Sequence, residues 1–530
     1  MADDLHAAAI RSAWRARPAV VLAAILGFAL LLRLVAMATP SIIHPDEIFQ
    51  YLEPAHRWLF GYGIVPWEAH YGIRNWLLPI LITGPMALGH ALAPATNLYI
   101  VLPRLFAVLV SLTLPATAWI LGRRLSPAHG AIAGLVTASW AEFVIFAPHT
   151  LSEQFALAAM LPAAAVLLAA PAQNRRALAA AGALLMLAGL FRFQYAPALA
   201  TLALATIGRR PDRWPPLIAG ALAMAVLGVL VDLATGLLPF GWFVENIRQN
   251  LLQNRASYYG TLGPLGYVTW FEHMWRWWLI PIAPLVWIGG KRYPALLATA
   301  IVHLVFHSLI AHKEYRFVEL SAVLFILLAA IGSVDVADRL ARRRPDWPPR
   351  LILGTIAALW LVASASTLSG RELNGMRVEG SDTLALTSRL RADPDLCGVA
   401  LFANDLVEWG GYVELHRPVP VTSYLPGDPM LHGRTPSQAL AADAGRINRI
   451  IGNPDGIGIP AGFTRTACAA PAGGQKPTMC LYARTGQCRG GSATPFALQS
   501  VFDRTDQLIR DAARADALRA SRLSKGALAR

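Results

Sequence analysis

Charged residues are scarce in this chain: only 15% of its 530 residues are Asp, Glu, Lys or Arg. A soluble globular domain carries about 25% charged residues, so the composition argues against an ordinary soluble enzyme. Phosphate-binding signatures of the G-x-G-x-x-G and P-loop types are also missing, which argues against a nucleotide site. Cysteine is rare, and the four cysteines form no C-x-x-C pair of the kind that binds zinc.

Apolar residues, by contrast, make up 55% of the chain. They occur in blocks of roughly 20, which is the length that crosses a bilayer as a helix. The first block, Val20 to Ala38, is longer than the apolar core of a signal peptide, so we expect an uncleaved first span. The net charge of +14 comes from Arg clusters between the blocks, as in cytoplasmic loops, and we expect no nucleic-acid partner. The sequence thus predicts an all-α, polytopic membrane protein.

The basic clusters set the predicted topology. By the positive-inside rule they face the cytoplasm, with about 11 to 13 spans between them. Counting the spans puts every unusual polar motif on the opposite, exoplasmic side. Segment 76–121 must cross only once although prolines break it into two apolar stretches, so we expect a re-entrant or interfacial piece there. The clusters are Arg123-Arg124, Arg175-Arg176, Arg209-Arg210, Lys291-Arg292 and Arg339 through Arg344.

Beyond Ser369 the sequence becomes polar and rich in Gly and Pro, with short strand-like runs between turn signals. This change of composition predicts a small external α/β domain after the membrane domain. The tail alternates Asp and Arg at helical spacing, which predicts a solvated helix or one that touches anionic headgroups. The predicted parts are a transmembrane catalytic domain over 1–370 with external loops at 40–75 and 236–273, a soluble domain over 371–502, and a basic helical tail over 503–530.

All four cysteines lie after the last apolar block, at Cys397, Cys468, Cys480 and Cys488. An even number confined to one soluble region is typical of an oxidising compartment. We therefore expect two disulfides, with three pairings open.

The first external loop concentrates ionisable residues. HPDEIFQYLEPAHR begins at His44, directly after the first apolar block. Adjacent carboxylates such as Asp46 and Glu47 shift each other's protonation, which is how a general base is poised. A solvated turn that starts at Pro-Asp accounts for the same charges. The continuation WEAHYGIRN (67–75) suits sugar stacking and phosphate pairing, and also an aromatic belt at the membrane surface.

A second motif, HKEYRF, brings His312, Lys313 and Arg316 to the mouth of a predicted external hairpin. Cations on the side opposite the other basic clusters need an anionic partner. A lipid phosphate is the natural one because Arg matches it bidentately, although unspecific headgroup anchoring remains the alternative. Arg192, within FRFQ, is a further external cation between two short apolar halves. The amide-rich loop 236–273 could bind sugar hydroxyls or simply cover a cavity.

These motifs in this order resemble the signature regions of glycosyltransferase family 22. The matching pieces are HPDE-x-F-Q-x-x-EP, WE-x-x-x-x-x-IRN, N-x-x-x-N-x-x-x-x-YGT and HKEYRF, within about residues 20–425. The family comprises polyprenyl-phosphate-mannose-dependent α-mannosyltransferases of the N-glycan and GPI-anchor pathways, with the GT-C fold. The resemblance implies an inverting mannosyltransferase whose site faces the exoplasmic side, acting on a lipid-linked or cell-envelope glycan or glycolipid acceptor.

The resemblance also implies residue roles. Asp46 would be the base that deprotonates the acceptor hydroxyl, with Glu47 as its neighbour or as the alternative base. His312, Lys313, Arg316 and Arg192 would hold the donor phosphate. No cofactor is implied beyond the lipid-phosphate sugar itself, no metal ligand is assigned, and metal dependence stays open. Further substrate contacts are expected from His44, Glu53, Arg74, Glu153 and Tyr259.

Two alternatives stay open. Nothing in the sequence recognises the axial hydroxyl of mannose, so another lipid-phosphate sugar such as glucose or arabinose would serve equally well. A lipid-linked-glycan transporter is the second alternative, but transporters show repeated halves and charges near span midpoints, and neither pattern is evident here. The acceptor, its linkage and the oligomeric state are not encoded in any motif we identify.

Overall fold

The computed structural model describes residues 17–169, 174–402, 408–489 and 494–511. The chain divides into two compact units, which we call the helical unit and the sheet unit. The predicted external loop 40–75 groups with the C-terminal region rather than with the long apolar helices. The helical unit takes Met1–Met37, Arg104–Phe240 and Tyr259–Asn374, and the sheet unit takes Ala38–Pro103, Gly241–Tyr258 and Gly375–Arg530.

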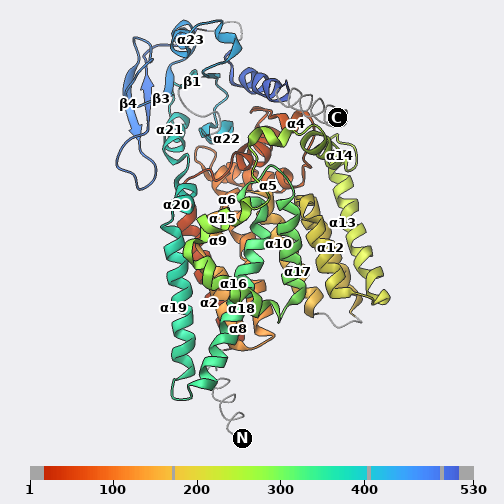
Figure 1. Ribbon diagram of the computed structural model, residues 1–530. Helices are drawn as coiled ribbons and strands as arrows, with labels where there is room; N and C mark the ends of the chain where they lie inside the picture. The colour runs from red at the N-terminus through yellow and green to blue at the C-terminus, as the bar shows by residue number, and fades with distance from the viewer. Residues whose placement is uncertain (1–16, 170–173, 403–407, 490–493, 512–530) are drawn as a thin grey trace, which may run out of the picture. The chain divides into compact units, whose positions relative to one another are not determined.

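The helical unit is built from apolar helices that pack in pairs, among them α7 with α8, α10 with α11, and α11 with α13. Helix α16 likewise packs on α18 (Figure 1). Its helices are α2 (Pro18–Met37), α7 (Thr113–Arg123), α8 (Pro127–Ser139), α9 (Ala141–Phe146), α10 (Ser152–Ala169), α11 (Arg175–Phe191), α12 (Ala196–Ile207), α13 (Trp214–Ala234), α15 (Gly266–Trp275), α16 (Leu279–Gly290), α17 (Pro294–Ser308), α18 (Glu319–Arg343) and α19 (Pro349–Leu368). Helices α6 (Leu98–Ser111) and α20 (Arg371–Val378) run across the boundary between the units.

Among the described residues, six helical segments are long and apolar enough to cross a membrane, and the protein is an integral multi-pass membrane protein. Further apolar helices are shorter, at 10–17 residues. Several predicted spans fall into this shorter class because prolines and polar breaks divide them, so the larger number of about 11 to 13 stays a prediction. The six segments are Pro18–Met37, Leu98–Arg123, Ser152–Ala169, Pro211–Ala234, Tyr315–Arg343 and Pro349–Leu368.

Two local features of the helical unit follow directly from its sequence. At the FRFQ motif, α11 ends at Phe191, Arg192 is extended, and a short 3₁₀ turn leads into α12, which confirms the predicted split. Where α11 meets α13, a Cβ on Gly182 would collide with the main-chain carbonyl group of Leu217. Glycine there lets the two backbones approach closely, as membrane helices do without a hydrophobic driving force between them.

The sheet unit combines short helices of the first external loop with a small C-terminal sheet. Its helical elements are the π-helix η1 (Glu47–Leu52), α3 (Glu53–Phe60), α4 (Trp67–His70), α5 (Leu77–Leu92), α14 (Gly241–Ile247), α21 (Ser381–Arg391), α22 (Gly411–Leu415) and α23 (Pro436–Asp443). Its strands are β1 (Val399–Phe402), β2 (Val421–Tyr424), β3 (Arg449–Gly452), β4 (Thr464–Ala469) and β5 (Met479–Ala483).

The strands form one mixed sheet in the order β2-β1-β3-β5-β4, visible as the blue arrows in Figure 1. Strand β1 pairs in parallel with β2 and β3, whereas β5 pairs antiparallel with β3 and β4. A core of residues such as Phe402, Tyr424, Leu440 and Ile450 packs between the sheet and α23. The small α/β domain predicted after the last apolar block is therefore present. Disulfides join Cys397 to Cys488 and Cys468 to Cys480, which selects one of the three pairings left open.

The start of the predicted tail differs from the expectation of a solvated helix. A helix over 498–511 buries Val501, Asp506 and Ile509. The ring of Phe502 lies 5.2 Å from that of Phe49, and the side-chain amide of Gln499 exchanges hydrogen bonds with the main chain of Val65. The apolar residues interleaved with the charges give this helix a buried face, which the charge pattern alone did not indicate. Residues 512–530 of the predicted tail lie outside the described part of the chain.

Candidate active site

The helical unit gathers the predicted phosphate-binding cations around two carboxylates. Arg192 and Arg316 both donate to the same oxygen of Glu153, at 3.1 and 2.9 Å. Arg192 comes from the break between α11 and α12, Arg316 from the turn before α18, and Glu153 from the first turn of α10. All three side chains are buried. Residues far apart in the sequence therefore form one group, and we call Arg192, His312, Lys313 and Arg316, with Glu153 and Glu314, the cation cluster.

Glu314 orders the HKEYRF loop. One of its oxygens accepts a hydrogen bond from Arg316 Nε at 2.6 Å, and the other accepts one from His312 Nε2 at 2.8 Å. The second ring nitrogen of His312, Nδ1, donates to the carbonyl oxygen of Gly260 at 2.8 Å. Because both partners can only accept, both ring nitrogens carry protons and His312 is an imidazolium. Burial alone would lower the pKa of His312, but these two bonds outweigh it and the net shift is upward.

The cluster carries an excess of positive charge. Arg192, His312 and Arg316 pair with the two carboxylates Glu153 and Glu314. With Lys313 as a fourth positive charge, the net charge of the group is 4 − 2 = +2. Lys313 Nζ donates to the carbonyl oxygens of Leu262 and Ile310, so its charge is not neutralised by an acid there. Burial lowers the pKa of Lys313. A surplus of two charges in a largely buried group is suited to a small dianion.

A buried acid that no sequence motif indicated also supports this loop. Glu142 of α9 is buried and accepts hydrogen bonds from Tyr315 Oη at 2.8 Å, Trp275 Nε1 at 3.0 Å and Trp140 Nε1 at 3.3 Å. Tyr315 lies between Glu314 and Arg316, so the Tyr315–Glu142 bond fixes the middle of the HKEYRF motif. A lone acid in an apolar stretch cannot be assigned such a role before the fold is known.

The sheet unit holds the predicted base. Asp46 lies at the start of η1, with its carboxylate 3.4 Å from His44 Nδ1 and 4.0 Å from an Arg74 terminal nitrogen. The Asp46 side chain is 14% exposed, whereas Glu47 is only 1% exposed. Of the two adjacent acids, Asp46 is thus the more exposed.

Glu53 anchors this loop to the C-terminal part of the sheet unit. Its two oxygens accept main-chain N–H hydrogen bonds from Ile64 at 2.8 Å, Tyr412 at 3.2 Å and Val413 at 2.8 Å. Gly411 is required beside it, since its φ is +77° and a Cβ there would lie 2.7 Å from the Glu53 carboxylate. Burial raises the pKa of Glu53 to about 7, although the three N–H groups act in the opposite direction.

Two further residues adjoin Asp46 that the sequence reading did not single out. Gln50 Nε2 donates to Glu68 Oε1 at 3.1 Å, and Gln50 Oε1 is buried without a hydrogen-bond partner among the described residues. Burial, followed by the negative charge of Asp46, raises the pKa of Glu68 to about 7. Both residues belong to the matching motifs, at HPDE-x-F-Q and WE. The motifs therefore marked their positions, but nothing in the sequence indicated what the two side chains do.

The aromatic residues after the loop have a structural partner. The guanidinium of Arg255 lies 3.7 Å from the ring centre of Trp67 and 5.1 Å from that of Tyr71, and it pairs with Asp506 of the C-terminal helix. One face of the Trp67 ring is therefore covered by Arg255. In the part of the predicted loop 236–273 that belongs to the sheet unit, the Asn246 side-chain amide donates to the carbonyl oxygen of Ile73.

Tyr259, a predicted substrate contact, is half exposed, and its ring lies 6.2 Å from that of His312. Elsewhere in the helical unit, His129, Asp335 and Asp338 place possible metal-ligand atoms within 4.8 Å of one another. Arg292 donates to both oxygens of Asp335, at 2.9 and 2.6 Å. A guanidinium thus already supplies positive charge to this group, and we assign no metal to it.

Comparison with known proteins gives consistent relatives. The sequence model of the Alg9-like mannosyltransferase family matches residues 24–373. GPI mannosyltransferase 3 of Yarrowia lipolytica is 27% identical over 338 residues, 60% of this chain and 63% of the relative. GPI alpha-1,2-mannosyltransferase 3 of Homo sapiens is 23% identical over 295 residues, 52% of this chain and 50% of the relative. The matched region thus spans between half and two thirds of these curated relatives.

Among solved structures, ArnT from Cupriavidus metallidurans bound to undecaprenyl phosphate superposes with a TM-score of 0.59. The match covers 89% of this chain and 99% of ArnT at 15% sequence identity. The apo state of the same protein gives a TM-score of 0.54. At this identity the likeness shows the fold alone, which is the GT-C fold predicted from the sequence.

Proposed function

The chain belongs to the Alg9-like mannosyltransferase family, and on this premise we propose that it transfers mannose from a polyprenyl-phosphate-mannose donor to a glycan or glycolipid acceptor. The site is proposed to face the exoplasmic side of the plasma membrane. The observation that carries this proposal is the cation cluster, in which Arg192 and Arg316 share one carboxylate oxygen inside a membrane protein. Buried cations of this kind mark substrate pathways in membrane proteins, and a lipid phosphate is a chemically matched ligand.

The charge of the cluster suits the leaving group. A polyprenyl-phosphate sugar is a phosphodiester with one negative charge, and the released polyprenyl phosphate has up to two. A surplus of +2 in the cluster therefore favours the product phosphate over the donor, and charge that develops in the transition state is stabilised most. In this proposal Glu153 and Glu314 hold the cations in place, so Glu153 positions Arg192 and Arg316 instead of touching the sugar.

The nucleophile is proposed to be activated by Asp46. As the acceptor oxygen bonds to the anomeric carbon, the bond from that carbon to the phosphate oxygen breaks, and the hydroxyl proton passes to the Asp46 carboxylate. Inversion follows from a single displacement. The greater exposure of Asp46 compared with Glu47 supports Asp46 as the base. His44 and Arg74 lie close enough to orient its carboxylate, while Glu53 anchors the loop and leaves no oxygen for the sugar.

The proposal is tested with purified full-length protein and synthetic polyprenyl-phosphate mannose carrying a radiolabel in the sugar. Added to membrane extract as the acceptor source, active protein should move the label into a new lipid or glycan fraction and release polyprenyl phosphate. Matched polyprenyl-phosphate glucose and arabinose test the alternative sugars, and a nucleotide-linked mannose should give no transfer. If labelled donor crosses a vesicle membrane with its sugar–phosphate bond intact, the transporter alternative replaces this proposal.

A further inference from the structure

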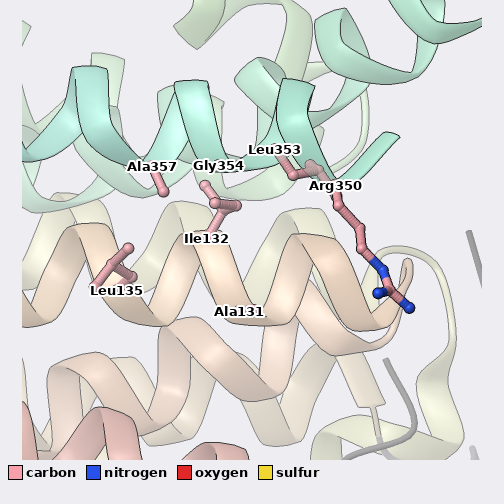
Figure 2. A pocket seen from close by; sticks show the side chains of 7 residues that line it. All are labelled: Ala131, Ile132, Leu135, Arg350, Leu353, Gly354 and Ala357. Carbon is pink, nitrogen blue, oxygen red and sulfur yellow. The ribbon is translucent and has the colours of Figure 1, made fainter. Parts of the chain in front are cut away.

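Helices α8 and α19 of the helical unit leave a hollow between them (Figure 2). Its volume is about 360 Å³. At one end the helices are joined, because Ser364 Oγ of α19 donates to the carbonyl oxygen of Ser139 of α8 at 2.6 Å. Toward the other end the residues of α19 that face α8 include Gly354 and Ala357, which are too small to fill the space. The lining residues are Ala131, Ile132, Leu135, Arg350, Leu353, Gly354 and Ala357.

The outer surface of α19, beside this hollow, is apolar and largely exposed. Helix α19 is one of the six long apolar segments, and only 33% of its apolar window is buried inside the protein. Its remaining surface is suited to contact lipid. A hollow that is lined by aliphatic side chains on such a helix is favourably filled by hydrocarbon, because an empty gap would lose dispersion contacts.

Arg350 is the charged residue that lines the hollow, and it lies at one end of it. Arg350 is exposed, and Figure 2 shows its guanidinium extending from α19 beyond the apolar part of the hollow. The segment just before α19 adds three more arginines and one acid, in RRRPDW at 342–347. Trp347 is 44% exposed, with the Arg344 guanidinium 5.9 Å from its ring centre, as is common at a membrane interface. Such a basic group beside a membrane helix attracts anionic headgroups.

We propose that the groove between α8 and α19 binds one anionic phospholipid, with an acyl chain along Ile132, Leu135 and Gly354 and the phosphate at Arg350. This lipid site is separate from the cation cluster, and it does not depend on the proposed transferase activity. The argument rests on charge complementarity: the groove offers an apolar trough with a cation at one end, which is the pattern of a phospholipid with a negative headgroup.

Gly354 offers a direct test, because a Cβ added there meets no atom within 4 Å. Gly354→Leu should therefore occupy the trough without disturbing the helix, and leucine is also a better helix former than glycine. Ala358→Leu adds a comparable side chain to an exposed position of the same helix and is the matched control. Arg350→Gln removes the charge alone. Each variant is first checked for a single species in detergent and for a melting temperature close to that of the wild type.

The measurement is native mass spectrometry of delipidated full-length protein titrated with phosphatidylglycerol or with phosphatidylcholine of the same acyl chains. For the first bound lipid, wild type should prefer phosphatidylglycerol about fivefold, which corresponds to about one headgroup–arginine contact. Gly354→Leu should weaken the binding of both lipids by roughly tenfold, which corresponds to the loss of about two buried methylenes. Arg350→Gln should lose only the preference for phosphatidylglycerol over phosphatidylcholine. The proposal is overturned if Gly354→Leu binds lipid like Ala358→Leu, or if wild type does not prefer the anionic lipid.

Discussion

The cation cluster of the helical unit and the acid loop of the sheet unit, residues 44–54, are held in place by different means. In the cluster, ion pairs hold the side chains in place: Arg192 and Arg316 both pair with Glu153, and Glu314 pairs with both Arg316 and His312. In the acid loop, main-chain N–H groups of Ile64, Tyr412 and Val413 hold the Glu53 carboxylate. The Asp46 carboxylate lies 3.4 Å from His44 Nδ1 and 4.0 Å from a terminal nitrogen of Arg74.

This difference fits two chemical tasks. A group that neutralises a phosphate needs fixed, dry cations, and paired carboxylates fix them while leaving a surplus of positive charge. A group that accepts a proton needs a carboxylate with a free lone pair within reach of the hydroxyl, on a loop whose backbone does not move. We therefore expect substitutions in the cluster to change donor affinity and rate together, and substitution of the proton acceptor to change rate alone.

The largest expected effect is that of Asp46→Asn, which keeps the shape of the side chain but cannot take up a proton. Turnover of polyprenyl-phosphate mannose should fall by about 10²- to 10⁴-fold, with donor affinity unchanged, because general-base catalysis contributes about that much. Initial rates and equilibrium donor binding on the same preparation separate the two quantities. Glu47→Gln is the matched variant. Wild-type turnover in Asp46→Asn with loss in Glu47→Gln would move the base by one residue.

Arg316→Ala should weaken both donor affinity and rate, by about 2–4 kcal/mol in total, because it removes a buried charge-assisted partner and leaves Glu153 and Glu314 less neutralised. Saturation binding of the lipid donor and single-turnover rates measure the two parts. Arg248→Ala is a suitable control, since Arg248 is an exposed arginine that pairs with Glu245, outside both groups of residues. Full donor affinity in a correctly folded Arg316→Ala protein would contradict a phosphate role for the cluster.

The two regions also differ in how far the sequence revealed them. The family, the GT-C fold and the small C-terminal sheet domain were predicted and are confirmed. Contiguous motifs, HPDE and HKEYRF, carried that information because their charges stand out against apolar sequence. The roles of Asp46, Arg316 and the other site residues stay predictions, although the structure brings Arg192 beside Arg316 as one cluster.

What the sequence could not reveal depends on contacts over long distances along the chain. Glu142 supports Tyr315 from 173 residues away, and Glu53 meets Val413 from 360 residues away. No local pattern of spacing or charge encodes such partners. The helical character of the tail was predicted, but the buried face of the helix over 498–511 was not. Charges dominate its sequence, and the buried face becomes evident only with Phe49 and Val65 beside it.

Glu53 should make the stability of the sheet unit depend on pH. Burial raises the pKa of Glu53 to about 7 from its ordinary value of 4.5. A raised pKa contributes stability that is fully present below pH 4.5 and is lost as the pH rises through 7. The loss between pH 5 and pH 8 should be on the order of 3 kcal/mol, because one pKa unit corresponds to about 1.4 kcal/mol.

The check is thermal unfolding of the detergent-solubilised protein across pH 5–8, for wild type and for Glu53→Gln. The amide variant should be somewhat less stable at low pH, since its NH₂ group cannot accept from Val413, and its stability should depend less on pH. Glu68, whose pKa is also raised to about 7, leaves a residual slope in both proteins. Identical slopes for the two proteins would show that Glu53 is already ionised at pH 5.

The smallest expected effect is that of the disulfides on stability. All four cysteines belong to the sheet unit. A reductant should therefore destabilise the sheet unit and leave the helical unit unaffected. Within the sheet unit, Cys397–Cys488 closes a separation of 91 residues and Cys468–Cys480 one of 12.

In the chain-entropy account, a longer closed loop removes more freedom from the unfolded chain, and the two separations differ by about 2 kcal/mol in this term. The double variant Cys397→Ser with Cys488→Ser should thus lose about 2 kcal/mol more stability than Cys468→Ser with Cys480→Ser, as measured by denaturant unfolding followed through a sheet-unit probe. Wild type must show no reactive thiols before reduction. Equal losses in the two double variants would mean that the unfolded sheet unit retains structure between residues 397 and 488, so that the longer disulfide constrains little.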